Sequence, residues 1–256
     1  MAQKKYKFVH GWKPDLPDHR DRHYKITAPV DIPDKFDLKS IMPPVYDQGR
    51  LGSCTANAIA GAIESVFHAS KQIDFTPSRL FIYYNERALE GTIQSDAGAE
   101  IRDGIKTVAR QGVCPEPMWP YEIAKFTTKP KKACYDDGAK NIALLYERVA
   151  QDPNVIEQLI AGGRPIIFGF SVYTAFEGPA VAKTGILNLP EPHETLLGGH
   201  AVLCVGYDRP NQRFLIRNSW GPKWGQQGYF TMPYDYLCNP KLADDLWCIE
   251  TMKDVG

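Results

Sequence analysis

The strongest constraint on the fold is a change in apolar spacing about halfway along the chain. In the first half, apolar side chains recur three and four positions apart, which predicts helices with one buried face at 54–67, 79–89, 101–110 and, briefly, 155–160. In the second half, short apolar runs rich in β-branched and aromatic residues predict strands at 165–170, 201–207, 214–218 and 229–232. A helical half before a sheet half predicts an α+β fold of two lobes with a cleft between them.

The composition narrows the classes of partner. The 256 residues are 43% hydrophobic and carry 30 basic and 30 acidic side chains, so the chain can bury a large core but has no net charge to attract nucleic acid or anionic lipid. No apolar run approaches the roughly 20 residues that span a bilayer, and no apolar signal region follows the first lysines. We therefore expect a peptide or a small molecule as the partner, no nucleic acid, no membrane, and a cytoplasmic location.

A cysteine stands at the start of the first predicted helix. The segment 46–54 (YDQGRLGSC) leads through two glycines and Ser53, a natural N-cap, to Cys54. Unpaired backbone N–H groups and the helix dipole stabilise a thiolate at such a position, and the thiolate is the nucleophilic form. Cys54 is therefore a candidate nucleophile, although most free cysteines are small buried hydrophobic residues.

Three downstream segments decide between these interpretations. They are 198–207 (GGHAVLCVGY), 217–221 (RNSWG) and 224–229 (WGQQGY). Together with Cys54, and in this order, they resemble the papain and cathepsin family of cysteine peptidases, and the similarity runs from about residue 37 to 247. The resemblance implies a papain-like fold with a helical lobe at about 33–155 and a β-barrel-like sheet lobe at about 156–256.

The resemblance also implies the roles of four residues. Cys54 would be the nucleophile and His200 the general base, paired before substrate arrives as thiolate and imidazolium, with the thiol pKa far below that of a free cysteine. Asn218 would orient the His200 ring, and Gln48, six residues before Cys54, would help to stabilise the oxyanion. The implied reaction is peptide-bond hydrolysis in a peptide or protein substrate, through a thioacyl enzyme and without a cofactor or metal.

The substrate site is also implied by the resemblance. One wall of the cleft is expected at Gly98 and Ala99, and Trp220 is expected to shield the bond between Asn218 and His200. Ala201 should line the pocket for the second residue upstream of the cut, with Leu246 at its floor. This placement predicts an apolar preference for Leu, Val or Phe, but a shift of one residue would put the Asp245 carboxylate there instead.

Two positions depart from the family pattern. Leu51 stands where secreted members have a disulfide-forming cysteine, and Thr55 replaces the tryptophan that usually follows the nucleophile. Neither change removes a reacting group. The sequence leaves the pairing of the other five cysteines open. They are Cys114, Cys134, Cys204, Cys238 and Cys248.

Residues 1–32 form an N-terminal arm in front of the expected catalytic domain at 33–256. The arm is rich in proline and basic residues and lacks apolar periodicity, so we expect an extended segment. It is too short for the helical pro-domain of secreted relatives. Three interpretations stay open: an inhibitory pro-segment in or near the cleft, as in a zymogen, a structural strap over one lobe, and an idle tail.

Other functions remain as alternatives. The fold could serve as a catalytically silent binding protein, or the same cysteine could transfer the acyl group to an amine as a transamidase. A zinc site at His193 and Glu194 would need a second histidine at position 197, which is Leu197. No chemistry is expected from His10, His19, His23 or His68. We expect a monomeric endopeptidase.

Overall fold

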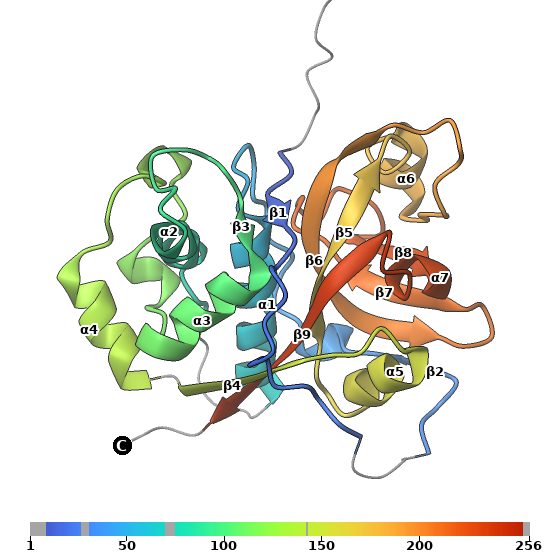
Figure 1. Cartoon of the computed structure of the whole chain (residues 1–256), viewed down its shortest axis with the longest axis horizontal. Coiled ribbons are helices and arrows are strands. Elements are labelled where there is room, and N and C mark those ends of the chain that lie inside the picture. The colour runs from blue at the N-terminus through green and yellow to red at the C-terminus, as the bar shows by residue number, and fades with distance from the viewer. Residues whose placement is uncertain (1–8, 27–30, 70–74, 142, 253–256) are drawn as a thin grey trace, which may run out of the picture.

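The computed structural model describes residues 9–26, 31–69, 75–141 and 143–252. Its helices and strands separate into a helical lobe and a sheet lobe that meet along α1 (Figure 1). The predicted α+β architecture is confirmed. Within the described residues, no helix is both long and apolar enough to cross a membrane.

The helical lobe is built from the predicted amphipathic segments. It contains α1 (Cys54–Ala69), α2 (Arg79–Leu89), α3 (Ile101–Gln111) and α4 (Lys132–Asn141), with short 3-10 turns at Glu116–Met118 and Ile123–Lys125. Helix α1 is buried on nearly every side along Cys54–Ser65, because α2 and α3 cover one side and strand β6 covers the other. It is therefore the central element of the molecule, and its first residue lies at the junction of the lobes.

The sheet lobe is a seven-stranded antiparallel sheet. The strands run in the order β4 (Ala143–Arg148), β9 (Ala243–Met252), β5 (Ile166–Tyr173), β6 (Leu196–Asp208), β7 (Arg213–Arg217) and β8 (Tyr229–Pro233), and β2 (Lys35–Asp37) pairs with β6. Helices α5 (Pro153–Ala161), α6 (Pro179–Thr184) and α7 (Tyr234–Leu237) and the turn Lys39–Ile41 complete the lobe. Strands β2 and β4 belong to this sheet although both precede residue 156.

The described part of the arm lies between the two lobes. Its strand β1 (Trp12–Lys13) pairs in parallel with β3 (Ala99–Glu100) on the helical side and also contacts β6. Figure 1 shows this blue segment running along α1. Farther on, His23 forms a parallel bridge with Arg148 of β4. The arm thus follows the junction of the lobes from one end to the other.

The connection after α3 depends on a glycine. Gly112 has φ +70°, and a Cβ atom there would lie 1.9 Å from the carbonyl oxygen of Gly138 in α4. Gly163 also has a left-handed φ of +84°, but a Cβ atom there would meet nothing within 4 Å. Alanine substitution at Gly163 therefore measures backbone strain alone, whereas the same substitution at Gly112 measures strain and steric overlap together.

We expect Gly163→Ala to lower the free energy of unfolding by about 1 kcal/mol, the cost of the left-handed conformation alone. Gly112→Ala should cost roughly 3 kcal/mol, because the overlap with α4 adds to that strain. Denaturant unfolding of both variants measures the difference. Equal losses would contradict the close contact between α3 and α4.

Candidate active site

Cys54 is fully buried at the first turn of α1. The backbone groups of Ala201, Gly11 and Thr55 hydrogen-bond its thiol. Ala201 belongs to β6 and Gly11 to the arm, so three separate segments of the chain meet at this sulfur atom. The structure therefore places the predicted nucleophile at the junction of the lobes, directly beneath the arm.

His200 lies on β6, next to Ala201. Its Nε2 atom is 2.8 Å from Asn218 Oδ1, which also accepts a hydrogen bond from the Ser219 backbone N–H at 2.8 Å. Because that N–H requires an oxygen acceptor, Nε2 carries the proton of the neutral ring. Nδ1 is buried without a hydrogen-bond partner among the described residues, which leaves it able to accept a proton.

Aromatic rings enclose the His200 imidazole. Trp220 stacks on it with ring centroids 5.0 Å apart and an interplanar angle of 28°. Phe170 and Phe176 make edge or tilted contacts with the same ring at 5.9 and 6.2 Å. These rings exclude water from the hydrogen bond between His200 and Asn218. Trp220 lies where the family resemblance led us to expect a shielding side chain.

Gln48 is completely buried beside the same site. Its Oε1 atom accepts a hydrogen bond from Ser219 Oγ at 2.6 Å, so the amide nitrogen points away from Ser219. That nitrogen donates to the carbonyl of Leu51 at 2.9 Å and to the arm carbonyl of Val9 at 3.3 Å. The side chain is thus held in one orientation with a donor directed at the arm.

The charge state of the pair differs from the expectation. Burial raises the pKa of Cys54 to about 11, and the hydrogen bonds from Ala201 and Gly11 offset only part of this effect. Burial also lowers the pKa of His200 to about 3. The expected thiolate and imidazolium are therefore not the forms favoured in this structure, because removal of water penalises both charges. With the arm in place, burial therefore favours the neutral thiol of Cys54 and the neutral ring of His200.

A buried carboxyl lies next to the nucleophile, and no sequence motif indicated it. Thr55 Oγ1, at the position where the family pattern has a tryptophan, donates to Glu86 Oε1 of α2 at 2.6 Å. Glu86 is fully buried, which raises its pKa well above the usual range. The Thr55 departure is thus accommodated by a hydrogen bond.

The arm makes direct contacts around the pair. His10 Nε2 lies 2.7 Å from Glu177 Oε1, and its ring is 6.2 Å from that of His200 in an edge-on arrangement. The expectation of no chemistry at His10 rested on its place in the arm, whose path the sequence does not specify. Glu177 follows β5 and anchors His10 on the sheet lobe.

The residues expected to bind substrate contact the arm instead. Ala99 donates its backbone N–H to the Gly11 carbonyl at 2.8 Å, and a Cβ atom on Gly98 would overlap that carbonyl. The Trp12 indole lies against Gly169 and Gly199, where an added Cβ atom would come within 2.5 Å of the ring.

The end of the Trp12 indole meets a carboxylate. Trp12 Nε1 donates to Asp245 Oδ2 at 3.1 Å. Leu246, the residue expected at the pocket floor, is 1% exposed and its carbonyl accepts from the Val149 N–H. Asp245 rather than Leu246 therefore contacts the side chain that the arm inserts here.

Buried charges fix the arm below Trp12. Asp245 Oδ2 also accepts the Asp15 N–H at 2.7 Å, and Asp245 Oδ1 accepts from Arg148 at 2.9 Å. Asp15 in turn accepts the Trp247 indole N–H at 2.9 Å and the Arg102 backbone N–H at 3.1 Å. This anchor, formed by Asp15, Asp245, Arg148, Arg102 and Trp247, joins the arm to both lobes.

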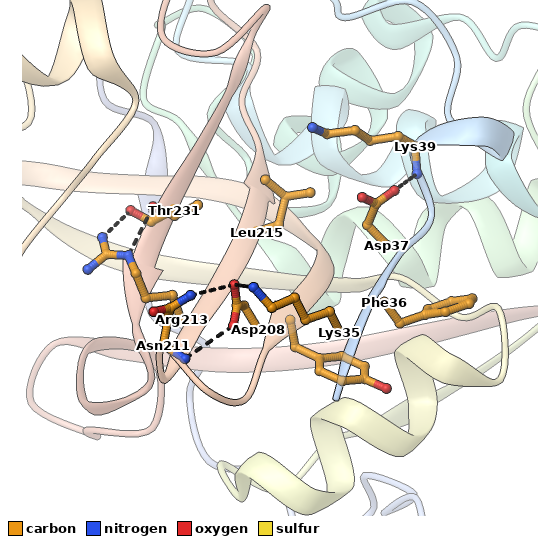
Figure 2. A pocket seen from close by; sticks show the side chains of 10 residues that line it. Lys35, Phe36, Asp37, Lys39, Asp208, Asn211, Arg213, Leu215 and Thr231 are labelled. Atoms are coloured by element: carbon orange, nitrogen blue, oxygen red, sulfur yellow. Dashed lines mark hydrogen bonds and ion pairs between the residues drawn. The ribbon is translucent and has the colours of Figure 1, made fainter. Parts of the chain in front are cut away.

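A surface pocket of about 710 Å³ lies elsewhere, between β2 and the strands β6 to β8 (Figure 2). Several of its charged groups already have partners: Lys35 lies 2.8 Å from Asp208, and Arg213 donates to Thr231 at 3.0 Å. Cys54 and His200 do not line it. The chemistry of the site does not extend to this pocket.

Comparisons with known proteins agree with the geometry. The profile of the papain family cysteine proteases matches residues 32–245. A peptidase C1-like protein of Acanthamoeba polyphaga mimivirus is 42% identical over 95% of this chain and 87% of its own length. Pro-cathepsin H of Mus musculus is 27% identical over 90% of this chain and 68% of its own.

Solved structures give the same result. Xylellain, a cysteine protease from Xylella fastidiosa, is 45% identical and superposes with a TM-score of 0.88 over 99% of this chain and 100% of its own. The digestive procathepsin L2 of Tenebrio molitor, 24% identical, shares the fold with a TM-score of 0.74 over 98% of this chain and 81% of its own. The chain belongs to the papain family of cysteine proteases and is a cysteine peptidase that acts on peptide substrates.

Proposed function

We propose that this chain is a latent endopeptidase in which Cys54 attacks the peptide carbonyl and His200 transfers the proton. The observation that carries the assignment is the fixed tautomer of His200: Asn218 holds Nε2–H, which leaves the Nδ1 atom, unpartnered among the described residues, as the acceptor for the Cys54 proton. Asn218 is a positioning residue in this scheme. A neutral amide suffices because the imidazolium is balanced by the thiolate.

The reaction then follows from the positions of the donors. Transfer of the thiol proton to His200 produces the thiolate, which adds to the carbonyl carbon of the substrate. The oxyanion accepts hydrogen bonds from the Gln48 amide and the Cys54 backbone N–H. His200 returns the proton to the departing amine, and then activates the water that hydrolyses the thioester.

We further propose that the arm is an inhibitory pro-segment. Three contacts support this role: the Gly11 backbone hydrogen-bonds the Cys54 thiol, the Val9 carbonyl accepts from the Gln48 amide where an oxyanion would, and Trp12 pairs with Ala99. A substrate needs the same three groups. The arm therefore competes with substrate for each of them.

The first prediction tests the catalytic roles. Cys54→Ala should reduce hydrolysis of a fluorogenic dipeptide to below about 1% of wild type, since no second thiol can form the acyl enzyme. His200→Ala should cost roughly 100-fold or more, and Asn218→Ala less, because it orients the ring rather than reacting. The three variants are compared in a chain that carries Trp12→Ala, with melting temperature as the control for folding. Substantial turnover by the Cys54 variant would refute the assignment.

The second prediction concerns inhibition by the arm. Trp12→Ala removes the partly buried indole, a loss of about 3 kcal/mol in packing. Activity toward a small peptide should rise at least about tenfold, since 1.4 kcal/mol of weaker docking already corresponds to that factor. Lys13→Ala is the matched control, because its partly exposed ammonium pairs only with Glu90. A fall in melting temperature without a rise in activity would contradict inhibition and would indicate that the arm is a structural strap.

The third prediction is a pH dependence of arm docking. Burial, followed by the charge of Asp245, raises the pKa of Asp15 from 3.8 to about 7, despite the nearby Arg102 and Arg148, which also pair with Asp21. A raised carboxyl pKa favours the docked form fully below 3.8, and this contribution is lost as pH rises through about 7. Docking should therefore weaken toward alkaline pH.

Thermal unfolding between pH 4 and 8 checks the predicted direction of this pH dependence. Wild type should lose stability across the range relative to Asp15→Asn, whose amide cannot ionise. Asp18→Asn is the control on the same arm, because hydrogen bonds from Arg20 keep the pKa of Asp18 below its usual range. Parallel pH profiles for wild type and Asp15→Asn would exclude Asp15 as the titrating group.

The fourth prediction concerns specificity and revises the apolar preference expected from Leu246. We propose that the site filled by Trp12 accepts the second residue upstream of the cut, with Asp245 at its end. Arg and Lys should then be preferred there by roughly tenfold over Leu, through a charge-assisted hydrogen bond. A peptide library compares wild type with Asp245→Asn, which should lose the preference, and with Asp244→Asn, which should keep it. An unchanged preference in Asp245→Asn would contradict the placement.

A further inference from the structure

Two buried thiols lie side by side in the helical lobe, away from the active site. All six cysteines fall within the described residues and none is paired. Cys114 follows α3 in an extended segment, and Cys134 lies in the first turn of α4; their exposed fractions are 0% and 1%. Neither residue has a role in the reaction proposed above.

The backbones that carry them are in close contact. Gly112 touches Gly138 so tightly that an added Cβ atom would lie 1.9 Å from the Gly138 carbonyl oxygen. Cys114 is two extended residues beyond Gly112, an advance of about 6–7 Å, and Cys134 is one helical turn before Gly138, about 6 Å back along α4. The Met118 carbonyl oxygen lies 3.8 Å from Cys134 Sγ, so the segment after α3 passes α4 in the direction from Gly138 to Cys134, and Cys114 lies between these two contacts.

The sulfur atoms themselves interact. The side chain of Cys134 hydrogen-bonds that of Cys114, and Cys134 Sγ also lies 3.8 Å from the Met118 carbonyl oxygen. The Cys114 carbonyl accepts the N–H of Ser78, the N-cap residue of α2. Both partners are thus held by neighbouring backbone while their thiols point at each other.

We propose that Cys114 and Cys134 are a disulfide-forming site that closes when the chain meets a disulfide oxidant of the oxidised glutathione class. The thiolate of one cysteine attacks the glutathione disulfide and releases one reduced glutathione, leaving a mixed disulfide. The second thiolate then attacks the protein sulfur of that bond and releases the other glutathione. Two protein thiols are oxidised and one glutathione disulfide is reduced, so atoms and electrons balance.

The bond would close the connection that runs past the active site. Residues 115–133 lie between the two cysteines and include Tyr121, whose hydroxyl donates to the Gln48 carbonyl at 3.0 Å and also hydrogen-bonds Ser53 Oγ. Gln48 and Ser53 flank the start of α1. Oxidation at this distant pair therefore constrains a loop that supports the Cys54 turn.

The test uses the full chain carrying Cys54→Ala, so that the reactive thiol cannot exchange. The protein is incubated with oxidised glutathione, its remaining thiols are alkylated in denaturant, and non-reduced peptides are mapped by mass spectrometry. We expect a 114–134 cross-link, a mass loss of two hydrogens, and a melting temperature higher by roughly 5 °C, because a loop of about 20 residues is closed in the unfolded chain. Dithiothreitol should reverse all three.

Matched variants separate this pair from the other cysteines. Cys134→Ala should abolish the mass loss and the stabilisation, whereas Cys238→Ala should leave both unchanged. The peptide map of the Cys54→Ala chain reads the pairing directly, independently of the folding of Cys134→Ala. A map with free thiols at both positions, or with a cross-link only between Cys204 and Cys238, would overturn the proposal.

Discussion

The burial of the Cys54 thiol and the His200 ring beneath residues 9–12 is the constraint on which the rest of the site depends. A thiolate and an imidazolium stabilise each other only where their combined charge is solvated or matched by donors. Here the Gly11 backbone replaces solvent at the sulfur, and His10 stands beside the His200 ring. Burial therefore favours the neutral form of both groups, so the contact that we propose to be inhibitory also disfavours the nucleophilic thiolate.

The arm reaches this position because its polar groups are satisfied on both sides. Its backbone joins β3 as a short parallel strand, while the anchor around Asp15 and Asp245 supplies partners for a carboxylate pair that burial would otherwise penalise. Arg148 compensates the two acidic side chains, at distances of 3.6 Å from Asp15 and 2.9 Å from Asp245. Docking of the arm and the protonation of this anchor are consequently linked.

Much of the fold was predictable because its signals are local. The spacing of apolar residues predicted α2 with its observed bounds and α3 to within one residue. Strands β4 and β9 were missed: β9 interrupts its apolar pattern at Asp244 and Asp245, where the sheet register shifts, and Asp245 has a left-handed φ of +56°. Such an irregularity depends on tertiary contacts with the arm.

The residues of the site also divide into those that local motifs predict and those that only the tertiary structure reveals. Cys54, His200, Asn218 and Gln48 stand in ordered motifs; the structure joins His200 to Asn218 directly and Gln48 to both through Ser219, and the Cys54 thiol lies beside Ala201, the neighbour of His200. Glu86, His10 and Asp245 carry no motif, because each acquires its place only when α2, the arm or β9 packs against the others. The pKa values of Cys54 and His200 could not be predicted from the sequence either, since they depend on how completely the arm excludes water.

The pH dependence of Cys54 alkylation tests the central claim most directly. The rate of iodoacetamide modification is followed at the Cys54 peptide by mass spectrometry, in the whole chain and in the Trp12→Ala variant. Wild type should react slowly with a midpoint near 11, and the variant should react faster with a midpoint below that of a free thiol. An acidic midpoint in wild type would contradict the account, because the arm would then cover an ion pair that it does not neutralise.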